Sequence, residues 1–171
     1  YIFDLKEGWN LISLPEEPLL SSAEEVFWSL GYNLLIAWTY DNEKKVWLKY
    51  KRGSLNSTFD QVEGERGYWL YVDKACSFGG VLSGKGSKRI NLFEGWNLVS
   101  YMGDEKSVLD ALYPLGNDWV IVWTWEDNQW YAKAHPLSGI DVPYPRIEKL
   151  KKGKAYWILM KPGAQAREWN Q

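Results

Sequence analysis

The sequence predicts a mainly β protein of the α+β class, built from two pseudo-symmetric copies of a small antiparallel β module with one short helix each. Three observations support this prediction. Four sequence blocks of the first half return in the same order in the second half. Runs rich in aromatic and β-branched residues alternate with short polar turns, as is typical of β-strands. One segment in each half has the capping and spacing signals of a helix.

The repeat has a nearly constant offset, which chance explains poorly. Its clearest block is Gly-Trp-Asn-Leu-Ile-Ser at residues 8–13, which returns as Gly-Trp-Asn-Leu-Val-Ser 87 positions later. Two further blocks recur at an offset of 85, and Tyr-Trp-Leu at residues 68–70 returns as Tyr-Trp-Ile 88 positions later. We therefore predict a first β-rich repeat at residues 1–86 and a second at residues 87–171.

Each copy begins with two predicted strands and a short helix. In the first copy the strands cover residues 2–5 and 9–14, and Gly8 can take the positive φ that closes a hairpin between them. The serines at residues 21–22 supply a hydroxyl cap, followed by acidic residues at the spacing of a capping box. The corresponding helix of the second copy is predicted over residues 106–115.

A second hairpin and a last strand complete each copy. In the first copy the hairpin joins residues 34–40 to residues 46–50 through a polar turn, and the last strand covers residues 68–72. The corresponding segments of the second copy are residues 119–125, 129–133 and 156–160.

Composition excludes several classes of function. The chain has one Cys and one His, so we expect neither a disulfide nor a zinc cluster. His135 lies in a loop without the nucleophile motif of a hydrolase, and turns or the helix account for most acidic residues. We therefore expect no enzyme activity, no cofactor and no metal. A formal net charge of −2 argues against nucleic acid as a partner, and no apolar run is long enough for membrane insertion.

The unusual feature of the composition is its aromatic content, with 12 Trp, 11 Tyr and 5 Phe among 171 residues. A ring kept in both copies serves what the copies share, which favours a structural role. The copies can also share a binding function, and that alternative stays open. The rule predicts a structural role for five pairs: Trp9/Trp96, Trp38/Trp123, Trp47/Trp130, Tyr68/Tyr156 and Trp69/Trp157.

Two criteria select the candidates for binding: occurrence of a ring in one copy only, and strand alternation. Alternation along residues 119–125 places Trp119, Trp123 and Trp125 on one face, which points outward if the opposite face is the core. Pyranose sugars stack on such rings, while polar side chains hydrogen-bond their hydroxyl groups. The same strip suits a protein partner, for which Trp and Tyr are common anchors. Polar residues for the sugar follow at once: Asp127, Asn128 and Gln129.

Three more rings are candidates for the same site. Trp28 lies opposite Tyr113 in the alignment of the two copies, and Tyr131 has no aromatic counterpart. Tyr144 belongs to a proline-rich loop that is longer in the second copy than in the first. Long loops on a rigid scaffold often carry binding groups.

The opening Gly-Trp-Asn-Leu-Ile/Val-Ser and the closing Gly67-Tyr68-Trp69-Leu70, which returns as Ala155-Tyr156-Trp157-Ile158, resemble duplicated modules of secreted and cell-surface proteins of thermophilic bacteria and archaea. Such modules often accompany polysaccharide-active enzymes. The resemblance covers essentially the whole chain and implies an extracellular or cell-surface accessory role. The second copy departs from the motif at Ala155, where the first copy has Gly67.

We therefore expect a non-catalytic carbohydrate-binding module that holds an attached enzyme or surface protein on a polysaccharide or oligosaccharide, of β-glucan type such as cellulose. The chain starts without Met, so we expect it to be part of a larger multidomain chain. The alternative is a structural or adhesive spacer of a cell-surface protein, with protein partners and nearly all of its rings buried.

Overall fold

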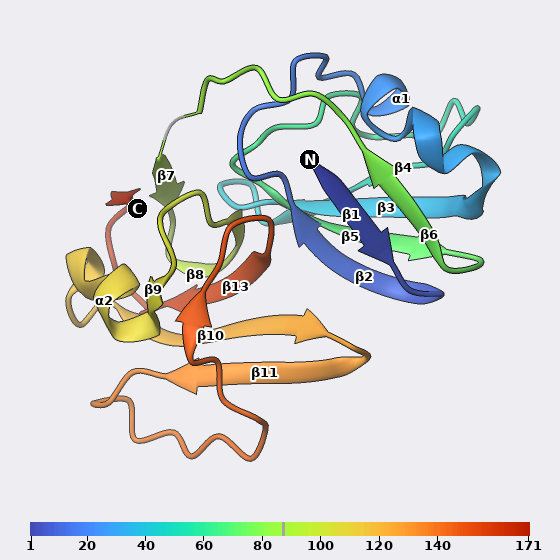
Figure 1. Ribbon diagram of the computed structural model, residues 1–171. Helices are drawn as coiled ribbons and strands as arrows, with labels where there is room; N and C mark the ends of the chain where they lie inside the picture. Colours follow the sequence, from blue (N-terminus) through green and yellow to red (C-terminus); the bar gives the residue numbers. More distant parts are fainter. Residues whose placement is uncertain (87) are drawn as a thin grey trace.

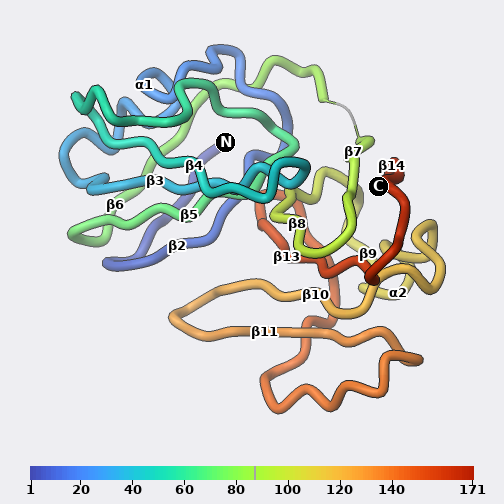
Figure 2. Tube along the Cα trace, turned by 180° about the vertical axis from the view of Figure 1, so that it is seen from behind, coloured from blue at the N-terminus to red at the C-terminus, as the bar shows by residue number. Residues whose placement is uncertain are grey.

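The computed structural model describes residues 1–86 and 88–171, which are organised around two four-stranded antiparallel sheets (Figure 1). Strands make up 45% of the chain and helices 11%, which confirms the predicted mainly β class. The two sheets occupy different ends of the molecule in both views (Figures 1 and 2). Among the described residues no helix has the length and apolar character needed to cross a lipid bilayer.

The first copy contains six strands, one α-helical turn and a 3₁₀ segment. In chain order they are β1 (Ile2–Leu5), β2 (Gly8–Ser13), α1 (Ala23–Val26), η1 (Trp28–Asn33), β3 (Leu34–Asp41), β4 (Val46–Tyr50), β5 (Gly67–Val72) and β6 (Cys76–Gly79).

The second copy repeats this series and adds two very short strands. Its elements are β7 (Arg89–Leu92), β8 (Gly95–Ser100), β9 (Lys106–Ser107), α2 (Val108–Leu112), η2 (Tyr113–Leu115), β10 (Trp119–Glu126), β11 (Gln129–Ala134), β12 (Lys149–Leu150), β13 (Ala155–Met160) and β14 (Arg167–Asn170).

The two copies have the same topology. The strand order is β2-β5-β3-β4 in the first sheet and β8-β13-β10-β11 in the second, so corresponding strands occupy corresponding places. A separate two-stranded ribbon accompanies each sheet, formed by β1 with β6 and by β7 with β14. The predicted hairpins β3-β4 and β10-β11 are confirmed, whereas β6 and β14 lie outside the predicted strands.

The hairpin predicted at Gly8 is wrong, because β1 pairs with β6 and β2 pairs with β5. Gly8 does have a positive φ of 91°. The reason for the divergence is Asn10, whose amide donates to the Lys6 carbonyl oxygen at 2.8 Å and accepts from the Lys6 N–H at 2.9 Å. Asn97 makes the equivalent bonds to Phe93 at 2.8 Å each. The Asn of the repeated motif therefore stabilises the bend between the first two strands of each copy, after which these strands pair in different sheets.

The helices begin at serine N-caps, as the sequence predicts, and each serine also bonds to the acidic residue three positions later. Ser22 accepts the N–H of Glu25 at 3.2 Å and donates to its carboxylate at 2.5 Å. Ser107 and Asp110 form the same pair of bonds at 3.1 and 2.6 Å. The second helix is shorter than predicted, because residues 106–107 form β9 and residues 113–115 form a 3₁₀ turn.

Each sheet buries one face against a core of its own copy. Tyr68 and Tyr156 lie at the centre of these cores, and their hydroxyl groups accept the backbone N–H of Glu63 at 2.8 Å and of Lys151 at 2.9 Å. Burial raises the pKa of both tyrosine hydroxyls. The structural role predicted for this repeated pair is therefore confirmed. Trp169 is also fully buried.

A β-bulge shifts the start of β10, and the outward position predicted for Trp119 is wrong for this reason. Trp119 pairs with Met160, but the next partners are Ile121 and Leu159, so Val120 is an extra residue. An inserted residue reverses the side-chain alternation beyond it. Trp119 consequently points into the core and is 2% exposed, whereas Trp123 and Trp125 lie on the outer face and are partly exposed.

Candidate functional site: two tryptophan pockets

The outer face of each sheet carries the tryptophans that recur in both copies. Cross-strand register places Trp38 beside Trp69 and Tyr40 beside Trp47 on one such face. Trp9 joins them from β2, with its ring 6.1 Å from that of Trp69 and nearly perpendicular to it. The corresponding rings of the second copy are Trp96, Trp123, Trp125, Trp130 and Trp157.

The two outer faces meet and bury a small third cluster between the copies. Its buried members are Leu11, Leu98 and Ala155, with the rings of Tyr40, Trp69, Trp125 and Trp157 packed around them. A Cβ placed on Gly67 would lie 2.7 Å from the Cβ of Ala155, so these two equivalent positions are in direct contact. The copies therefore associate through the same surface of each.

The contacts between the copies are reciprocal, which defines a pseudo-two-fold axis between them. The ring of Tyr40 lies 5.3 Å from that of Trp157, and the equivalent Trp125 lies 6.1 Å from Trp69. Two further contacts form another reciprocal pair, Trp47 with Trp157 at 5.5 Å and Trp130 with Trp69 at 5.7 Å.

Two aromatic pockets flank this axis, each lined by rings from both copies. The first-copy pocket is a cavity of about 610 Å³, lined by Trp9, Trp38, Trp47, Trp69, Trp125 and Trp130. The second-copy pocket is a cavity of about 530 Å³, lined by Trp96, Trp123, Trp130, Trp157, Tyr40, Trp47 and Tyr144. The two-fold relation converts one lining into the other except for Tyr144. Trp47 and Trp130 belong to both pockets.

The pocket rings are accessible to a ligand. Trp47 is 47% exposed, Trp9 and Trp96 are each 39% exposed, and Tyr144 is 45% exposed. Among the described residues the indole N–H groups of these three tryptophans have no hydrogen-bond partner, whereas that of Trp125 donates to the Trp9 carbonyl oxygen at 3.2 Å. Each pocket thus combines apolar ring surface with tryptophans whose indole N–H groups have no partner among the described residues.

Polar side chains from the hairpin turns hold the pocket walls together. Asn42, in the β3-β4 turn, donates to the Leu98 carbonyl oxygen at 3.2 Å and accepts its N–H at 2.8 Å. Lys45 donates to the Trp96 carbonyl oxygen at 2.7 Å, and partial burial lowers the pKa of this lysine. The pKa of the Tyr40 hydroxyl is raised, mainly by burial and to a smaller extent by the Asp41 carboxylate, so this hydroxyl stays neutral.

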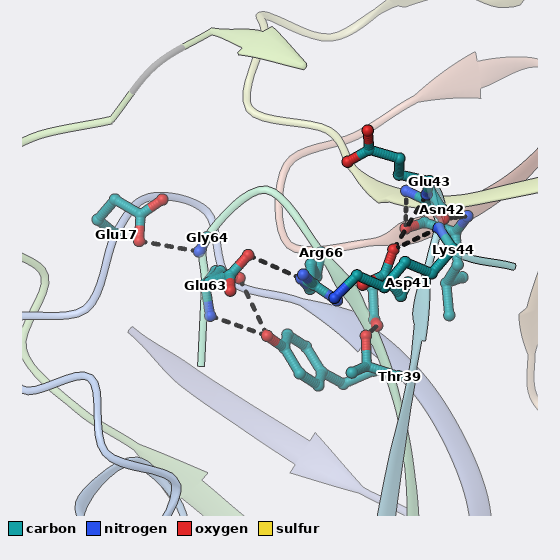
Figure 3. A network of polar contacts seen from close by, with 12 residues as sticks. Glu17, Thr39, Asp41, Asn42, Glu43, Lys44, Glu63, Gly64 and Arg66 are labelled. Carbon is teal, nitrogen blue, oxygen red and sulfur yellow. Dashed lines mark hydrogen bonds and ion pairs between the residues drawn. The ribbon is translucent and has the colours of Figure 1, made fainter. Parts of the chain in front are cut away.

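A polar network fixes the start of β5 at the interface (Figure 3). Arg66 donates from Nε to the Glu63 carboxylate at 2.7 Å and extends toward the β3-β4 turn. Thr39 donates to the Gly67 carbonyl oxygen at 2.8 Å. Residues of the first copy therefore hold Gly67 in position against the second copy.

The rings predicted to form the site fall into three places. Trp123, Trp125 and Tyr144 lie in the pockets, and the ring of Tyr144 is 5.1 Å from that of Trp123. Tyr131 lies on the opposite face of β11 and packs against the second core, because it pairs with the inward Thr124. Trp28 is exposed on η1, where the Arg52 guanidinium stacks 4.6 Å from its ring.

The polar residues predicted beside the rings serve the turn instead. Asp127 and Asn128 are the central residues of the β10-β11 turn, with φ values of 54° and 57° that Asp and Asn tolerate better than most residues. Asp127 also forms an ion pair with Lys6 of the first copy, which lowers the pKa of the Asp127 carboxyl group. Gln129 is the first residue of β11 and pairs with Glu126. The residues that line the two pockets do not include these side chains.

The repeat rule predicts a structural role for four tryptophan pairs that the structure places on the outer faces of the sheets, where Trp69 and Trp157 also pack between the copies. Rings present in only one copy, such as Trp119, Tyr101 and Trp169, are fully or almost fully buried instead. The sequence signal that identifies the pockets is the repetition of the tryptophans in both copies. The repeated rings lie on the outer face of each sheet, and these two faces meet at the interface.

The site is defined by rings and contains no group of metal ligands. Among residues 1–86 and 88–171 no cluster of three or more His, Cys, Asp or Glu side chains could hold a metal ion. The molecule is thus a tandem β-repeat protein with paired aromatic pockets. Neither a family model, nor a curated protein, nor a solved structure matches the chain.

Proposed function

We propose that the two tryptophan pockets bind carbohydrate, and that the chain is a non-catalytic module that holds an attached enzyme or surface protein on an extracellular polysaccharide. The observation that carries this proposal is the pair of solvent-open cavities lined by aromatic side chains. A sugar ring presents axial C–H groups to an indole face and leaves its hydroxyl oxygens free to accept indole N–H bonds.

The angles between the rings favour soluble chains over crystalline surfaces. Trp38 meets Trp47 at 90°, and Trp123 meets Trp130 at 89°. A crystalline polysaccharide face needs coplanar rings, whereas rings at right angles form a corner. Such a corner encloses single sugar units of a flexible chain on two sides, which increases the apolar area buried on binding.

Affinity electrophoresis tests the proposal with the isolated chain in gels that contain soluble β-glucan, xylan or mannan. We expect retardation in at least one gel, and loss of retardation for the double variant Trp38→Ala/Trp123→Ala, which removes one ring from each pocket. Trp28→Ala is the matched control, because this exposed indole lies outside both pockets. We also expect little retention on crystalline cellulose.

Two outcomes would reject the proposal. One is the absence of retardation in every gel, which would favour an adhesive spacer with protein partners. The other is unchanged retardation of the double variant, which would place sugar binding elsewhere. Far-UV circular dichroism of each variant verifies that the sheets are intact.

A further inference from the structure

We infer that the chain is a bivalent binder, in which each pocket takes its own carbohydrate segment and no single segment occupies both pockets equivalently. This inference rests on the proposed function and adds the number and arrangement of the bound segments. It follows from the reciprocal linings of the two pockets, which contain four tryptophans from one copy and two rings from the other.

The pseudo-two-fold axis determines how a polymer can meet the two pockets. A polysaccharide has a direction, since one end of the chain is reducing and the other is not. A single chain that crossed the axis would enter the two pockets with opposite polarity, because a two-fold rotation reverses every direction perpendicular to the axis. It could not make the same contacts in both pockets. Two separate segments, related by the same rotation, can do so.

Shared walls couple the two pockets. Trp47 and Trp130 line both cavities, while Trp38 lines only the first-copy pocket and Trp123 only the second-copy pocket. Removal of Trp47 should therefore weaken both binding events, and removal of Trp38 should weaken one. The two binding events are coupled only through these shared side chains, because each of the two indoles forms part of the wall of both cavities.

The two pockets are not identical, and Tyr144 makes the difference. Its ring contacts Trp123 edge-on at 5.1 Å and closes one side of the second-copy pocket. The first-copy pocket has no equivalent ring from a loop. We expect the second-copy pocket to bind more tightly, and Tyr144→Ala to lower that affinity alone by roughly two- to tenfold.

Isothermal titration calorimetry tests the inference with cellohexaose, xylohexaose and mannohexaose as probes. We expect two equivalents of at least one hexasaccharide per wild-type chain, one equivalent for Trp38→Ala or for Trp123→Ala, and none for the double variant. The wild-type stoichiometry decides the question even if a variant fails to fold.

The failures of the two proposals are distinguishable. A wild-type stoichiometry of one overturns bivalency and leaves carbohydrate binding intact. The absence of heat with all three hexasaccharides, together with unretarded migration in the polysaccharide gels, overturns carbohydrate binding and the bivalent arrangement together.

Discussion

Gly67 and Ala155 occupy the same position in the two copies and meet where the copies join. A Cβ on Gly67 would lie 2.7 Å from the Ala155 Cβ and 2.8 Å from Cδ1 of Leu98. Real carbon atoms do not approach this closely without displacement, so only one of the two positions accommodates a methyl group. The difference between Gly67 and Ala155 in the closing motif is therefore consistent with the space available at the interface.

Gly67→Ala should lower the free energy of unfolding by about 1–3 kcal/mol, because it overpacks the interface. Urea unfolding followed by tryptophan fluorescence measures this change. The exchange variant Gly67→Ala/Ala155→Gly removes the contact with the Ala155 methyl group but keeps the contact with Leu98, so it should recover part of the loss. A single variant as stable as the wild type would show that the interface can expand.

Individual residues also show how far the sequence could predict the site. The capping serines and the turn residues were predictable, because their signals are local. Trp123, Trp125 and Tyr144 were predictable from strand alternation and loop length. Trp119 was not, because a bulge has no clear signature in its residues. The roles of Trp47 and Trp130 depend on the other copy and could not be derived from either repeat alone.

At the level of the elements, the β3-β4 and β10-β11 hairpins reach across to the opposite copy. The turn of the first hairpin contacts β8 through Asn42, and the turn of the second contacts the loop before β2 through the ion pair of Asp127 with Lys6. Each hairpin thus contributes both to its own sheet and to a pocket wall of its neighbour.

Asn42→Ala should destabilise the protein by about 1–3 kcal/mol, because it removes both hydrogen bonds to the backbone of Leu98 and leaves those groups unpaired in a partly buried place. Chemical denaturation gives the change in unfolding free energy. Glu43→Ala is the control in the same turn, since the side chain of Glu43 is exposed. Equal effects of the two substitutions would argue against a specific role for Asn42.

For the elements, the sequence was informative about strands and less so about their partners. Hydrophobic alternation and polar turns located β3, β4, β10 and β11. The same logic paired β1 with β2, because a short connection with a glycine is the usual hairpin signal. The side chain of Asn10 overrides this signal by bonding back to Lys6. β6 and β14 are short partners of the first strand of each copy, and their pairing is determined by distant residues.

On the scale of the whole molecule, two independent cores are joined by a third, smaller cluster and by aromatic contacts. The rings of Tyr40, Trp69, Trp125 and Trp157 pack at the interface and also border the pockets. Separation of the copies would expose these rings to water, which costs free energy in proportion to the apolar area. Neither copy should therefore unfold independently.

We expect one cooperative unfolding transition, with coincident midpoints by tryptophan fluorescence and far-UV circular dichroism. Gly67→Ala should move both midpoints together, since it perturbs the surface that joins the copies. Two resolved transitions, or a fluorescence change that precedes the loss of β-structure, would show that the interface opens before the cores unfold.

The pairing of Gly67 with Ala155 and the presence of Tyr144 in only one pocket have a common consequence for how this protein can vary. In an assembly of two identical chains, every substitution is repeated on both sides of the axis, so a methyl group at the meeting point would collide with its own counterpart. A tandem chain encodes the two sides separately. One cavity is free to acquire a new wall and a new selectivity while the other retains the original one.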